Sequence, residues 1–180
     1  FKSGESVTTG VQNTLIGGLA GDALTDADTN IAIGYQALTT DTLGSQSVAI
    51  GDRALANQNF TSATNSLNTA VGYAAGISVT TGTANTFLGN VAGSSTTTAS
   101  NNTAVGYASL GANTTGANNT AVGGQGVLDA NTTGSQNTAI GGGALSSNTT
   151  ASNNTSVGHA SLIRNTTGAS NVAVGVDALN

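Results

Sequence analysis

The stretch that decides the fold is Asn102-Thr103-Ala104-Val105-Gly106-Tyr107-Ala108-Ser109-Leu110, followed two residues later by the turn Asn113-Thr114-Thr115-Gly116. A glycine that follows a short apolar run recurs along the whole 180-residue chain, and most of these glycines are spaced as Gly89 and Gly106 are. A fixed period of this kind is typical of solenoids, so residues 1–180 are predicted to form a single repeat domain. The glycines that anchor the coils are Gly17, Gly34, Gly51, Gly72, Gly89, Gly106, Gly123, Gly141, Gly158 and Gly175.

Two intervals between these glycines are longer than the others, the one from Gly51 to Gly72 and the one from Gly123 to Gly141. We interpret the extra residues as loop insertions, one within residues 57–66 and one within residues 124–126. Loops on rigid scaffolds commonly carry recognition. We therefore expect Asn59 and Phe60 to protrude and to form the candidate recognition loop.

Apolar residues flank each glycine in a period-two pattern. The residue before it is β-branched in nine of the ten repeats, and the residue before that is usually alanine. This alternation indicates a short β-strand, with the β-branched column expected to be the buried face. Leucines four residues after the glycine, such as Leu38 and Leu55, predict a second buried wall. The residues taken to represent the structural repeat are Val71, Gly72, Val105, Gly106, Val122, Gly123, Ile140 and Gly141.

These features predict an all-β fold, a parallel β-solenoid or β-roll of about ten 17-residue coils. Stacked coils would supply each other's backbone hydrogen bonds, and a spacing of roughly 4.8 Å gives a rod about 45 to 50 Å long. Asn-Thr-Thr-Gly segments such as residues 113–116 are expected to form polar turns, because Asn and Gly tolerate left-handed backbone angles.

The core of one such coil would be thin, because its two apolar patches are separated by a long polar arc. Burial contributes about 25 cal/mol per Å² of apolar surface, whereas ordering a residue costs about 1 to 2 kcal/mol. We therefore expect a homotrimer, intertwined or side by side. The Ile/Val, Ala and Leu columns would lie inside, Asn, Thr and Asp would face water, and copies could continue head to tail.

Two known families show similar repeats. The segment Ser47-Val48-Ala49-Ile50-Gly51-Asp52-Arg53-Ala54 resembles the signature repeat of trimeric autotransporter adhesin heads, which are left-handed parallel β-rolls. The longer copy at residues 102–116 more closely resembles shaft repeats of phage and marine-virus tail fibres. The resemblance implies a fibre shaft on a virion or outside a cell that supports attachment to a host receptor or glycan, with a bacterial surface adhesin or self-assembling filament as the alternative.

The composition argues against several other functions. The chain has no Cys, Met, Trp or Pro, one His and only 6% charged residues, so we expect no enzyme, no cofactor and no metal site. Three Lys and Arg residues give no basic patch for nucleic acid, and no apolar run is long enough to insert into a membrane. The chain starts without Met or a signal-like segment, which indicates a processed chain or an excerpt.

A few residues could serve catalysis, Ca²⁺ binding or glycan contact. His159 could serve catalysis, but we expect it to be a surface residue. The acidic segment Asp26-Ala27-Asp28-Thr29-Asn30 could meet Ca²⁺, yet Ile31 stands where a calcium loop needs Gly, so a solvated turn is expected. The three tyrosines, Tyr35, Tyr73 and Tyr107, could contact glycans, although an edge-covering role is favoured.

Two further alternatives concern the repeated turns. Asn113, Asn131, Asn148 and Asn165 each begin an Asn-Thr-Thr sequon, which turn chemistry and Asn stacking explain without a glycan. Regularly spaced Thr residues also suggest ice binding, but the array of Thr pairs is interrupted, so ice binding remains a remote alternative.

Overall fold

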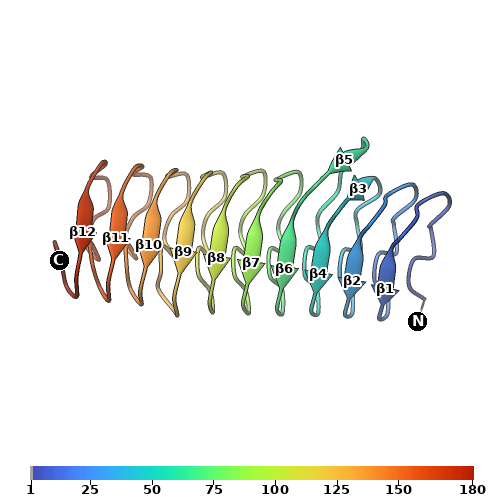
Figure 1. Cartoon of the computed structure of the whole chain (residues 1–180), viewed down its shortest axis with the longest axis horizontal. Coiled ribbons are helices and arrows are strands. Elements are labelled where there is room, and N and C mark those ends of the chain that lie inside the picture. The colour runs from blue at the N-terminus through green and yellow to red at the C-terminus, as the bar shows by residue number, and fades with distance from the viewer. Residues whose placement is uncertain (1) are drawn as a thin grey trace.

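The computed structural model describes residues 2–180 as an all-β rod whose coils follow one another from the N-terminus to the C-terminus (Figure 1). A ten-stranded parallel sheet runs along the rod, and a two-stranded sheet lies near one end. The long sheet consists of β1 (Thr14–Ile16), β2 (Ile31–Ile33), β4 (Val48–Ile50), β6 (Thr69–Val71), β7 (Thr86–Leu88), β8 (Thr103–Val105), β9 (Thr120–Val122), β10 (Thr138–Ile140), β11 (Thr155–Val157) and β12 (Val172–Val174). The short sheet pairs β3 (Gly44–Ser45) with β5 (Thr64–Asn65).

Each repeat forms one coil, and neighbouring coils pair in register. Thr103 lies opposite Thr120 and Val105 lies opposite Val122. The hydrogen bonds run from coil to coil, because the Thr103 amide donates to the carbonyl of Asn119 at 2.8 Å. The predicted parallel β-solenoid is confirmed, and its coils have the predicted length.

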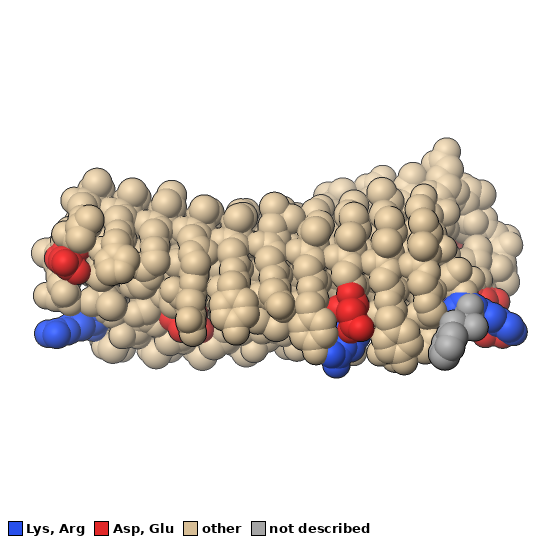
Figure 2. All heavy atoms as spheres, turned by 90° about the horizontal axis from the view of Figure 1, so that it is seen from below, with Lys and Arg blue, Asp and Glu red and all other residues tan. Residues whose placement is uncertain are grey.

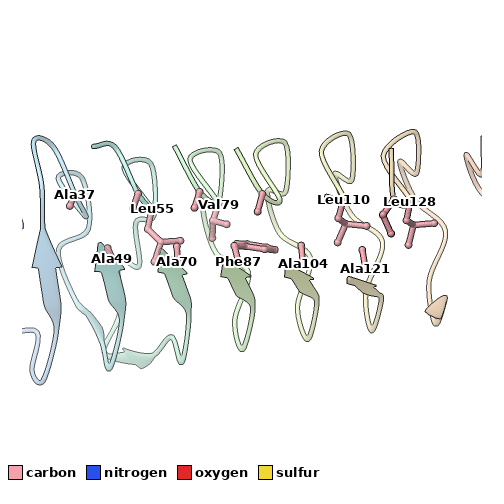
Figure 3. Close-up of a cluster of buried hydrophobic side chains, with 14 of the residues drawn as sticks. Ala37, Ala49, Leu55, Ala70, Val79, Phe87, Ala104, Leu110, Ala121 and Leu128 are labelled. Atoms are coloured by element: carbon pink, nitrogen blue, oxygen red, sulfur yellow. The ribbon is translucent and has the colours of Figure 1, made fainter. Parts of the chain in front are cut away.

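The strand face that points into the coil is the alanine column. The side chains of Ala49, Ala70, Ala104 and Ala121 are fully buried and point from their strands toward the opposite wall (Figure 3). The β-branched residues point outward. Val71 keeps 36% of its surface exposed and Ile140 keeps 39%. The prediction that the β-branched column is buried is therefore wrong. The buried column is the alanine column, one residue earlier in each strand, so the inward and outward faces of the sheet are the reverse of those predicted.

The second wall explains why alanine faces inward. Leu38, Leu55 and Leu110 are fully buried, so the predicted leucine wall is confirmed. A small residue three positions after the repeat glycine, such as Ala37 or Ala54, is buried beside it. Leucine side chains from this wall fill most of the narrow space between the two sides of the coil. Only a small side chain fits opposite them on the strand.

At β7 the size pattern is reversed, with a large residue on the strand and small residues on the second wall. Phe87 takes the inward position of β7, and the second-wall leucine is replaced by glycine in the same coil and in the preceding coil, at Gly93 and Gly76. A Cβ at Gly76 would lie 2.7 Å from the Phe87 ring, and a Cβ at Gly93 would also collide with it. The same exchange occurs at Leu15, since a Cβ at Gly21 would lie 2.6 Å from its side chain. Large and small residues thus compensate across the coil.

The repeat glycine is required by both its conformation and its contacts. Gly89 has a φ of 143°, and a Cβ there would lie 2.5 Å from the carbonyl oxygen of Gly106 in the next coil. Any other residue would push the two coils apart at this bend. The glycine column therefore sets how closely the coils can stack.

The larger insertion forms a projection near β5, but Asn59 and Phe60 do not form its tip (Figure 1). Phe60 is only 6% exposed, and the Asn59 amide donates to the carbonyl of Thr80 at 2.9 Å. The exposed tip consists of residues 61–63. The prediction that Asn59 and Phe60 protrude is wrong, because Phe60 is buried and its amide donates to the carboxylate of Asp41. The single extra residue of the other insertion lies between Gly123 and Val127, as expected.

Replacing Phe87 by alanine should leave a cavity and lower the free energy of unfolding by about 3 to 5 kcal/mol. Adding Gly76→Leu and Gly93→Leu should recover much of this loss, because both glycines have a φ of 58° and Leu110 adopts 54° at the matching position. Urea denaturation of the wild type, the single variant and the triple variant measures the effect. A triple variant less stable than Phe87→Ala would contradict the proposed size compensation.

Candidate functional site: the outward face of the long sheet

The outward face of the long sheet carries two parallel columns of uncharged side chains. The first column starts each strand and is mostly threonine, as in Thr103 and Thr120, and the second ends each strand with Ile, Val or Leu. Within a column the side chains repeat at the strand spacing of about 4.8 Å, and the two columns lie about 6 to 7 Å apart. We call these twenty residues the outward face.

The outward face leaves apolar surface in contact with water. Besides Val71 and Ile140, Ile16 is 57% exposed, Leu88 is 37% exposed and Val174 is 70% exposed. Scattered apolar residues are normal on protein surfaces, but a continuous apolar column marks an interaction site. None of the twenty residues is charged.

Charged side chains lie elsewhere and are few. Figure 2 shows isolated red and blue groups on a largely uncharged rod. One ion pair joins Lys2 to Glu5 near the N-terminus, and another joins Arg53 to Asp52 at 2.9 Å. The hydrogen bond from Arg53 to Asp52 is the main cause that raises the pKa of Arg53. Such exposed pairs contribute little to stability.

An asparagine column, buried in most coils, precedes every strand of the long sheet except β4, where Ser47 takes this position. The Asn119 backbone amide donates to the Asn102 side-chain oxygen at 2.9 Å, and the Asn119 side chain donates to the carbonyl of Gly134 at 2.8 Å. The same pattern repeats at Asn85 and Asn137. These bonds tie the strands to their neighbours and to the turn, so they help to hold the outward face in register.

The Asn-Thr-Thr-Gly turns build a second buried column. Asn131 donates from its side chain to Asn113 and to the carbonyl of Gly134, both at 2.9 Å, and its oxygen accepts from Asn148 at 2.9 Å. All three asparagines are fully buried. The prediction that Asn faces water is wrong, and burial also makes these three sequons unsuitable for a glycan in the folded chain. The left-handed angles expected in this turn are also absent at Asn113 and Gly116.

In the coil that precedes the larger insertion, Asp41 replaces the turn asparagine and anchors a buried polar network. Its carboxylate accepts from the amides of Gly44 at 3.1 Å and Phe60 at 2.9 Å, and from the Gln58 side chain at 2.6 Å. Gln58 in turn donates to Ser47 at 2.8 Å. The polar network around Asp41 and Gln58 was not predicted from the sequence. The sequence feature that could have predicted this network is the replacement of the turn asparagine by Asp41 and Gln58 in two successive coils.

The acidic segment does not converge on a cation site. Thr9 donates its hydroxyl to Asp26, the Val11 amide donates to Asp28 at 2.8 Å, and Asn30 belongs to the buried strand-start column. Within residues 2–180, no three His, Cys, Asp or Glu side chains lie close enough to hold a metal ion. His159 is exposed beside the bend after β11, as expected of a surface residue.

Two further features of the surface bear on function. No pocket opens in the part of the chain that the structure describes. That same part contains no helix long and apolar enough to cross a membrane.

Asn131→Ala should lower the free energy of unfolding by about 1 to 3 kcal/mol, because it leaves buried partners in the adjacent coils without a hydrogen bond. Thr133→Ala in the same turn is the matched control, since Thr133 is exposed and should change stability by less than about 0.5 kcal/mol. Thermal unfolding followed by circular dichroism compares them. Equal effects at the two positions would show that the buried column does not hold the coils together.

The comparisons with known proteins give no relative. The chain matches no protein-family model, no curated protein and no solved structure. The function therefore has to be inferred from the rod and its outward face.

Proposed function

We propose that this chain is a segment of a structural fibre shaft in which three copies pack side by side through their outward faces. The single observation that carries the proposal is the uncharged, partly to largely exposed column of Ile, Val and Leu along the ten-stranded sheet. A monomer would leave this column in water along the whole rod. Three copies around one axis would bury it.

The strand pairing favours the side-by-side form of the trimer over the intertwined form. Every strand of the long sheet pairs with the strand of the next coil in the same chain, from β1 to β12. The turns also close within the chain, since the Leu110 amide donates to the carbonyl of Val127 at 3.1 Å. Chains that are already paired internally associate by their faces.

The side chains of the outward face suit contact between identical copies. β-Branched residues are stiff and repeat at a constant spacing, so the ridges of one column fit between the ridges of another. The absence of charge means that no buried ion has to be desolvated at the axis. Burying this surface would add apolar area without ordering further residues.

A shaft role also fits the remaining architecture. The coils stack along one direction, and β1 and β12 each pair with only one strand of the long sheet, which leaves edges where further coils can continue head to tail. We assign the shaft to an extracellular or virion-borne fibre, as in a phage or viral tail fibre that supports attachment to a host surface. A bacterial surface adhesin or self-assembling filament remains the alternative, since either would use the same rod.

Ice binding is the second candidate function. The threonines that suggest it in the structure are those that begin the strands of the long sheet, and not the Thr pairs of the turns. Six successive strands, β6 to β11, begin with an outward Thr, which together with the apolar column forms a regular array. The face would then have to stay exposed to water. A monomer that slows ice growth would support this candidate, whereas a trimer would bury the array.

Val105→Asp should prevent association and leave a folded monomer, because Val105 points outward and a charge at the axis would be desolvated. Ala104→Asp should abolish folding, because Ala104 is fully buried inside the coil. Thr115→Asp in an exposed turn is the control and should change neither property. Sedimentation and circular dichroism report assembly and folding separately.

The wild type should sediment as a trimer, with three times the 17.3 kDa mass of one chain. A wild type that stays a folded monomer at micromolar concentrations would overturn the trimer and leave the solenoid intact. A Val105→Asp variant that still forms trimers would show that another surface mediates association.

A further inference from the structure

A second surface feature lies outside the outward face, at the residue that directly follows each repeat glycine. Five successive coils place Tyr35, Asp52, Tyr73, Asn90 and Tyr107 at this position, so tyrosine alternates with a planar polar residue. The three tyrosines are 46%, 46% and 54% exposed. We call these five residues the aromatic edge.

The backbone holds the aromatic edge in register. The Arg53 amide donates to the carbonyl of Tyr35 at 2.9 Å, and the Val91 amide donates to the carbonyl of Tyr73, also at 2.9 Å. The Ala108 amide donates in the same way to Asn90 at 3.0 Å. Each residue of the edge therefore lies one coil further along the rod than the previous one.

This register sets the distance between tyrosines. Two strand spacings of about 4.8 Å separate successive rings by about 9 to 10 Å along the rod. That distance is close to the length of one disaccharide in an extended β-1,4-linked glycan. In such a glycan every second sugar presents the same face, so alternate sugars could stack on successive tyrosines.

The residues between the tyrosines suit the hydroxyl groups of such a glycan. Asp52 offers acceptors, Asn90 offers both donors and acceptors, and both reach the surface in the coils between the rings. Arg53 lies against the Tyr73 ring, with its guanidinium carbon 4.9 Å from the ring centre, and also donates to Asp52. A row of exposed rings with hydrogen-bonding groups between them needs no pocket to bind an extended chain.

We propose that the aromatic edge binds an extended β-1,4-linked glycan lying parallel to the rod. The site uses no residue of the outward face. It would give the shaft itself, and not only a distal tip, a contact with polysaccharide.

Isothermal titration calorimetry of the full chain with cellohexaose and with chitohexaose tests this site, with maltohexaose as the α-linked control. At least one β-linked hexasaccharide should bind, and maltohexaose should bind at least about tenfold more weakly. Tyr73→Ala should weaken binding by about tenfold, whereas Tyr73→Phe should retain it within about threefold because the ring remains. Circular dichroism and sedimentation should be unchanged in both variants, since Tyr73 is exposed and outside the long sheet.

A position swap separates ring spacing from ring number. The double variant Tyr73→Asn with Asn90→Tyr keeps three tyrosines but places two of them on adjacent coils. Both residues occur naturally at this coil position, so the fold should be retained. The swap should weaken binding as much as Tyr73→Ala. Wild-type affinity in the swap, or no binding of either β-linked hexasaccharide to the wild type, would overturn the proposal.

Discussion

Every part of this structure depends on coils that lie directly on one another in register. Each strand of the long sheet is only three residues long, so its hydrogen bonds must be made by the coils on either side. The glycine column allows this close approach, because a Cβ at Gly89 would strike the backbone of the next coil. The two asparagine columns then add side-chain hydrogen bonds between the same coils. Stability is consequently a sum over neighbouring coils.

The narrow interior of the coil decides which residues are left to interact with other molecules. The leucine wall leaves room only for alanine on the strand, so the larger Ile and Val residues point outward. The exception at Phe87, with glycine at two neighbouring wall positions, shows that the limit is the total side-chain volume in the coil. A single chain therefore satisfies its own core and still presents an apolar face. That face is the physical basis for the proposed shaft.

The repeat glycines and the period-two apolar pattern were enough to predict the parallel solenoid, the coil length and the leucine wall. The side of each strand that faces the interior was not predictable in this way. Ala and Val are both apolar, so the alternating pattern does not show which of them points inward. Asn131 was assigned to the surface because asparagine is common in turns, whereas burial depends on hydrogen-bond partners in adjacent coils. Phe60 was expected to protrude because the length of an insertion does not show which of its residues are buried.

Interchain distances between spin labels test most directly whether identical outward faces meet at one axis. The chain has no cysteine, so single substitutions at Val105 and at the exposed Thr115 give clean labelling sites. Pulsed dipolar spectroscopy should give a shorter interchain distance for labels at residue 105 than for labels at residue 115. The reverse order, or no dipolar coupling between chains at either position, would contradict the account.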